Sequence, residues 1–174
     1  MFGYALEPNE QVLCAKTLDL ETSEIKSDIQ PLITIGTAIT SGEDLATKGG
    51  VYIFRLMDVV PEPGKPETGV GLRLVAHEEV KGAVTGVSMI GREGFLMMAQ
   101  GQKLLVRGLK EDGSLLPVAF MDVQCYVTVC KELPGTGLCI IGDAVKGLWF
   151  VGYRVSWTHL LPCVRLLNRF RSVD

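Results

Sequence analysis

The run Gly50–Leu56 has the sequence Gly-Val-Tyr-Ile-Phe-Arg-Leu, and it indicates most clearly which kind of fold this chain adopts. β-Branched and aromatic side chains dominate the run, and such side chains suit the pleated, largely buried surface of a sheet. Its apolar residues are consecutive and lack the three-to-four-residue spacing of an amphipathic helix. The run therefore predicts a β-strand.

Ten further runs of the same kind extend along the chain. Each is about four to eight residues long, and turn-forming Gly, Pro, Asp or Asn residues separate it from the next, as in strands joined by turns. No long amphipathic helix lies between them, so the pattern favours an antiparallel meander over βαβ units. The other candidate strands are Gln11–Leu18, Leu32–Thr37, Leu72–Glu78, Ala83–Met89, Gly94–Ala99, Lys103–Gly108, Val118–Met121, Tyr126–Cys130, Leu138–Ile141 and Leu148–Tyr153.

Two antiparallel architectures, a β-sandwich and a β-propeller, accommodate such a list of strands. A Gly-Gln or Gly-Asp step leads into an apolar run at Gly101-Gln102 and again at Gly142-Asp143, and the first residues of the two steps are 41 positions apart. This spacing falls within the period of about 40–45 residues of a four-stranded blade. It favours the propeller.

Composition limits the function classes that need to be considered. The chain has 174 residues, is 47% hydrophobic and has a net charge of -3, so it can form one sizeable core and lacks the basic excess of a duplex nucleic-acid binder. Its apolar runs are far shorter than the roughly 18 residues of a membrane helix, so no membrane partner is expected. The five cysteines are an odd number without a CxxC pair or a secretory leader, which indicates a reducing, intracellular compartment and no metal site.

Catalytic motifs are missing from the sequence. The run Gly64-Lys65-Pro66 ends in proline where a phosphate-binding loop needs a backbone amide, and there is no Gly-x-Ser-x-Gly elbow. Only two histidines are available as near-neutral bases, His77 within a candidate strand and His159 in the segment after Arg154. We therefore expect no catalytic, cofactor-binding or metal residue, no small-molecule substrate and no enzyme activity.

Several longer motifs resemble a known family. They occur in the family's order and at compatible spacing, and the Pro-rich insert Asp58–Pro66 is similar to that of one member in particular. The chain resembles the C-terminal propeller region of the large subunit of the cleavage and polyadenylation specificity factor. The damaged-DNA-binding protein and the splicing factor 3b propeller subunit belong to the same superfamily. The motifs are Ile35–Ala38, Gly42–Asp44, Lys48–Phe54, Asp58–Pro66, Glu79–Thr85, Gly101–Leu104, Ala119–Asp122 and Gly142–Leu148.

The resemblance implies an all-β fold and a nuclear function. Residues 11–153 would form an incomplete β-propeller of about three four-stranded antiparallel blades after a lead-in at residues 1–10, as a fragment of a longer chain. The implied function is a protein-interaction scaffold in pre-mRNA 3′-end cleavage and polyadenylation. Its partners would be the other subunits of that complex, and the alternative is direct binding of pre-mRNA by the same subunit.

Residues 154–174 depart from the family motifs and are expected to form an irregular or short helical tail. The segment from Ser156 has the apolar spacing and the arginines of a short amphipathic helix. A gene model that reads through a splice boundary, a basic docking helix and a diverged strand are the three interpretations of this tail. Its arginines, Arg165, Arg169 and Arg171, are the candidate RNA-contacting residues.

The remaining motif residues are expected to be structural. Five glycines lie where strands begin, end or turn, at positions that need positive φ or a close backbone approach. An aspartate at a strand end commonly accepts hydrogen bonds from backbone amides in a turn. The insert Pro61–Gly69 is expected to be an exposed loop because proline disrupts a sheet interior. The candidate structural residues are Gly36, Gly49, Gly82, Gly101, Gly142 and Asp143.

Overall fold

The chain folds into antiparallel strands throughout its described part, which confirms the all-β prediction. The computed structural model describes residues 3–21, 30–42, 47–61, 63–64, 69–92, 94–145, 147–158 and 161–168. Within these residues no helix is long and apolar enough to cross a membrane. The strands in them are β1 (Glu10–Leu20), β2 (Gln30–Ile39), β3 (Gly49–Asp58), β4 (Val70–Val80), β5 (Val84–Ile90), β6 (Phe95–Gln100), β7 (Lys103–Leu109), β8 (Leu115–Asp122), β9 (Val127–Leu133), β10 (Leu138–Asp143), β11 (Leu148–Thr158) and β12 (Leu161–Asn168).

The strands form three antiparallel sheets of four consecutive strands each. Sheet 1 contains β1 to β4, sheet 2 contains β5 to β8 and sheet 3 contains β9 to β12, each in sequence order. Equivalent strands of sheets 2 and 3 begin 43 residues apart, from Val84 to Val127 and from Phe95 to Leu138. This offset matches the predicted blade period, although Gly101 and Gly142 occupy different places in their sheets, one in a turn and one inside β10.

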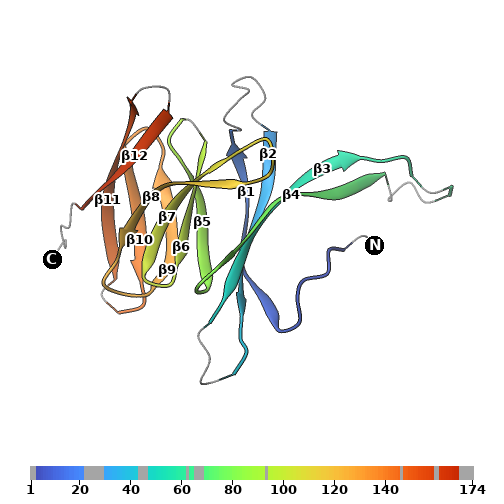
Figure 1. Cartoon of the computed structure of the whole chain (residues 1–174), viewed down its shortest axis with the longest axis horizontal. Coiled ribbons are helices and arrows are strands. Elements are labelled where there is room, and N and C mark those ends of the chain that lie inside the picture. The colour runs from blue at the N-terminus through green and yellow to red at the C-terminus, as the bar shows by residue number, and fades with distance from the viewer. Residues whose placement is uncertain are drawn as a thin grey trace.

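The first strands of the three sheets lie next to one another. β5 contacts β1 on one side and β9 on the other, and among the last strands β8 contacts β12 (Figure 1). Consecutive four-stranded antiparallel sheets that pack face to face and meet through their first strands are arranged as the blades of a propeller. The predicted incomplete propeller of about three four-stranded blades is confirmed.

Strands β5, β6 and β7 of sheet 2 are largely buried on both faces, which explains why they are nearly continuous apolar runs. Along β6, Leu96 and Met98 belong to the core shared with sheet 1, whereas Met97 and Ala99 belong to the core shared with sheet 3. All four side chains are fully buried. A strand packed on both faces loses the alternation of apolar and polar residues that marks a half-exposed strand.

The helical interpretation of the tail is wrong. β11 continues to Thr158, and β12 pairs with it from Val151 opposite Asn168 to Thr158 opposite Leu161. β12 completes sheet 3 as its edge strand, where Pro162 is tolerated because a proline at a sheet edge removes no necessary ladder hydrogen bond. Of the segment that suggested a helix, residues 156–158 end β11 and residues 161–168 form β12, while the others lie outside the described residues.

The Pro-rich insert connects β3 to β4. Val59 donates a backbone hydrogen bond to the Gly69 carbonyl at 2.9 Å, which closes the base of the connection. Pro61 and Gly64 are exposed, and residues 62 and 65–68 lie outside the described residues. That the whole insert Pro61–Gly69 is an exposed loop stays a prediction.

Candidate interaction surface

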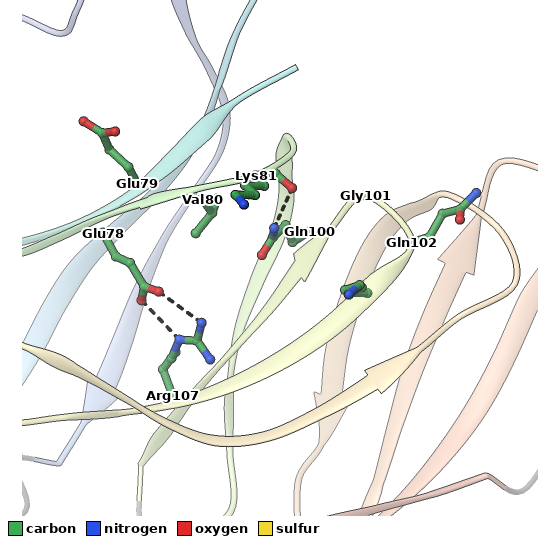
Figure 2. Close-up of a pocket in the computed structure, with 9 residues that line it drawn as sticks. Glu78, Glu79, Val80, Lys81, Gln100, Gly101, Gln102 and Arg107 are labelled. Carbon is green, nitrogen blue, oxygen red and sulfur yellow. Dashed lines mark hydrogen bonds and ion pairs between the residues drawn. The ribbon is translucent and has the colours of Figure 1, made fainter. Parts of the chain in front are cut away.

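A groove lies between sheet 1 and sheet 2, where the end of β4 faces β7 and the turn between β6 and β7. It has a volume of about 440 Å³, and charged and amide side chains make up most of its lining (Figure 2). The groove exists because the two sheets pack closely at β1 and β5 and diverge toward their outer strands. We call it the inter-sheet groove.

An ion pair across the groove joins the two sheets. The Arg107 guanidinium on β7 donates from Nε to Glu78 Oε2 at 3.1 Å and from Nη2 to Oε1 at 3.0 Å, as Figure 2 shows. The side chains of Arg107 and Glu78 are only 14% and 28% exposed. A partly buried bidentate pair of this kind fixes orientation more firmly than an exposed ion pair does.

The rim of the groove is held by the turn between β6 and β7. Gly101 there has a φ of 56°, which an L side chain rarely adopts, and its amide donates to the Ala83 carbonyl at 3.2 Å. Gln100 Nε2 donates to the Lys81 carbonyl at 2.6 Å (Figure 2). The Val127 amide donates to the Gly101 carbonyl at 2.8 Å. The turn is therefore tied to the chain on both sides.

Two of the predicted structural glycines lie where the backbones of sheets 1 and 2 approach each other closely. A Cβ at Gly36 would lie 2.6 Å from Val84 Cγ1 and 2.7 Å from Cys14 Sγ. A Cβ at Gly49 would lie 2.6 Å from the carbonyl oxygen of Gly82, whose own φ is 129°. Real Cβ atoms are not found this near to backbone, so these positions accommodate only glycine.

The other two predicted structural residues lie at the end of β10. A Cβ at Gly142 would be 2.7 Å from Val129 Cγ1 on β9, beside the irregularity in the ladder between these strands. Asp143 Oδ1 accepts a hydrogen bond from the Val145 amide at 2.8 Å, and Oδ2 accepts one from Trp149 Nε1. Asp143 thus organises the loop between β10 and β11.

The arginines proposed for RNA contact are not brought together in the described part of the chain. Arg165 lies on β12 opposite Arg154 of β11, while Arg169 and Arg171 lie outside the described residues. The charged residues of the inter-sheet groove, in contrast, were not among the sequence candidates. Arg107 had one available signal, because a cation directly after the apolar residues Leu104, Leu105 and Val106 of a predicted strand often marks a buried ion pair.

The described residues contain no candidate metal-binding site, and their buried thiols are not activated. No cluster of three or more His, Cys, Asp or Glu side chains occurs there, and Cys14, Cys125, Cys130 and Cys139 are free. Burial raises the pKa of Cys130 and of Cys139 to about 12. Both thiols therefore stay protonated at neutral pH and pack as small apolar side chains.

Three consecutive four-stranded blades, joined through their first strands, place the chain in the β-propeller class. The family described as "CPSF A subunit region" matches residues 1–172. The chain belongs to this family, which confirms the resemblance given by the sequence motifs. The match includes the segment after Arg154 that contains β12.

Fungal proteins named Cft1 are similar to the chain over most of its length. Protein cft1 of Neurospora crassa is 60% identical over 149 residues, which cover 85% of this chain and 10% of that protein. Protein CFT1 of Coccidioides immitis is 58% identical over 151 residues, covering 87% of this chain and 11% of that protein. Protein cft1 of Schizosaccharomyces pombe is 40% identical over 151 residues, with shares of 87% and 10%. The chain spans about a tenth of the length of these curated relatives.

Proposed function

We propose that the chain is a non-catalytic scaffold segment of the nuclear machinery that cleaves and polyadenylates pre-mRNA. The observation that carries this proposal is the family match over residues 1–172, together with the sequence identity to the Cft1 proteins. Its partners are the other subunits of the cleavage and polyadenylation complex. The chain acts by presenting surfaces, and it performs no reaction on a small-molecule substrate.

The geometry supports a scaffold because the blades expose large apolar side chains that do not pack in the core. On sheet 1, the paired residues Leu56 and Leu72 are 55% and 47% exposed, and on β8 Phe120 is 69% exposed. Large apolar side chains left in solvent on a well-ordered sheet are typical of surfaces that contact other proteins. The overall net charge of -3 favours protein partners over a phosphate backbone.

Affinity purification of the tagged chain, expressed in the nucleus of a fungal host, tests this proposal. After nuclease treatment, the other subunits of the cleavage and polyadenylation complex should remain bound, because protein contacts hold them. Loss of these subunits on nuclease treatment, together with salt-dependent binding of the purified chain to RNA, would replace the scaffold with direct pre-mRNA binding. Absence of these subunits from the untreated purification would refute the proposed function itself.

A further inference from the structure

The inter-sheet groove continues beyond Arg107 along β8. This second stretch has a volume of about 480 Å³, and Lys103 and Arg107 border both stretches. Leu105, Pro117 and Phe120 contribute apolar lining to it. Each stretch is within the range of about 300–1,000 Å³ that is typical of ligand pockets. The two stretches therefore form one continuous groove with a polar end and an apolar end.

Phe120 is the main apolar feature of the second stretch. It pairs across the ladder with Leu105, a member of the core between sheets 1 and 2, so both side chains point toward sheet 1. Leu105 is 8% exposed, whereas Phe120 is 69% exposed. The core thus ends at Leu105 and leaves the aromatic ring beside it uncovered, which is the situation of an anchor residue at an interface.

The charged side chains that line the apolar end are both cations. Arg107 uses Nε and Nη2 for Glu78, and its remaining amine, Nη1, lies outside this bidentate pair. Lys103 is 3.7 Å from Asp122, with the two side chains 55% and 69% exposed. An ion pair this exposed contributes little to stability, so a ligand carboxylate can take the place of Asp122.

The backbone of β8 favours an extended ligand. β8 is the edge strand of sheet 2, with β7 as its ladder partner among the described residues. An edge strand offers outward-facing amides and carbonyls to which a peptide can add as a further strand, while the alternate side chains of that peptide enter the neighbouring groove. Pro117 lacks the N–H group, which limits such pairing to the part of β8 that contains Phe120.

We propose that the inter-sheet groove binds an extended peptide segment of a partner protein, in which an apolar side chain packs on Phe120 and a neighbouring carboxylate pairs with Lys103. This inference rests on the proposed scaffold function and names the chemistry of one partner. RNA is disfavoured because Lys103 and Arg107 are the cations that line the apolar end and Arg107 is already paired with Glu78, so a run of phosphates would meet few counter-charges there.

An array of short overlapping peptides from the other subunits of the complex provides the test. The chain is applied to the array as the wild type and as the variants Phe120→Ala and Lys103→Glu. Matched controls are Leu116→Ala, which truncates another exposed residue of β8 outside the groove lining, and Lys131→Glu, which makes the same charge change on β9. Circular dichroism confirms that each variant keeps its strands.

The wild type should bind peptides in which an apolar residue lies beside Asp or Glu. Phe120→Ala and Lys103→Glu should each weaken that binding about tenfold or more, as expected for central interface residues, while both controls bind as the wild type does. Equal binding by all variants would overturn the inference. Binding of oligouridylate that depends on Phe120 and Lys103, without any such peptide, would also overturn it.

The same variants separate this inference from the proposed function. In one outcome, the wild-type chain and both groove variants retain the complex subunits equally after nuclease treatment, and no peptide on the array depends on Phe120 or Lys103 for binding. The proposed scaffold function then stands and the groove inference fails. If the wild type retains none of the subunits, the proposed function fails. Selective loss of one subunit from both groove variants, and from neither control, supports the inference.

Discussion

Replacing Gly36 by alanine should destabilise the fold, because this residue lies where β2 of sheet 1 meets β5 of sheet 2. The new methyl group would be 2.6 Å from Val84 Cγ1, 2.7 Å from Cys14 Sγ and 2.8 Å from the Val84 carbonyl oxygen. Carbon atoms in contact are ordinarily about 3.5–4.0 Å apart. Val84 is fully buried, and one of the three close atoms is backbone, so rotating a side chain cannot relieve the contact. The two sheets must move apart.

The cost follows from this displacement. Overpacking a well-packed core by one methyl group typically costs about 1–3 kcal/mol. The lower conformational entropy of alanine in the unfolded chain offsets about 0.4–1 kcal/mol of that cost. The net loss is therefore about 1–2 kcal/mol, which corresponds to a fall in melting temperature of about 2–8 °C for a chain of this size. Thermal and urea unfolding, followed by circular dichroism, measure it.

Gly108→Ala is the matched control for this prediction. Gly108 also lies in a strand, but a Cβ there would meet Val118 Cγ2 at 3.5 Å and Phe95 Cε1 at 3.6 Å, which are ordinary contacts. Its substitution should leave the stability unchanged within about 0.5 kcal/mol or raise it slightly. If Gly36→Ala and Gly108→Ala have the same stability, the close approach of β2 and β5 does not restrict position 36 and the reasoning is wrong.

Three further predictions concern other parts of the fold. Glu132, a buried carboxylate on β9, accepts hydrogen bonds from the Gly91 amide and the Tyr153 hydroxyl. Glu132→Ala should therefore cost about 2–5 kcal/mol in urea unfolding, and a double-mutant cycle with Tyr153→Phe that shows no coupling would contradict this. Burial raises the pKa of Cys130 and of Cys139 from 9.0 to about 12, so these thiols ionise first in the unfolded chain as the pH rises. Their contribution to the unfolding free energy should therefore be present below pH 9.0 and be lost between pH 9.0 and about 12, and urea midpoints that do not change across this range would refute it. The exposed pair Leu56 and Leu72 should cause the purified chain to self-associate, so Leu56→Glu with Leu72→Glu should lower the mass measured by light scattering while Leu116→Glu does not.

The strand content and the blade period were predictable because both depend on local chemistry. Glycine and proline interrupt the chain wherever strands end, and each of the eleven predicted runs overlaps a strand of the structure. β12 was missed because the apolar spacing between Leu160 and Leu167 fits a helix as well as a strand. The free edge of β11 decides between them, and no local pattern contains that information.

The inter-sheet groove could not be predicted because its parts are distant in sequence. Glu78 and Arg107 lie on different sheets, and nothing near either residue identifies its partner. The sequence predicts a strand that contains Phe120, and this prediction is correct. The exposure of its side chain, however, depends on where the core between sheets 1 and 2 ends.

The sequence by itself determined the all-β class, the strand positions up to Tyr153, the expected close-approach glycines and the family, because turn chemistry, β-propensity and motif order are properties of the chain read locally. Tertiary structure alone decided that the tail is a strand, that Arg107 pairs with Glu78 and that Phe120 stays in solvent. The physical reason is that pairing, burial and exposure depend on which sheets face each other. In the inter-sheet groove, the divergence of sheets 1 and 2 from β1 and β5 outward decides the pairing of Arg107 with Glu78 and the exposure of Phe120.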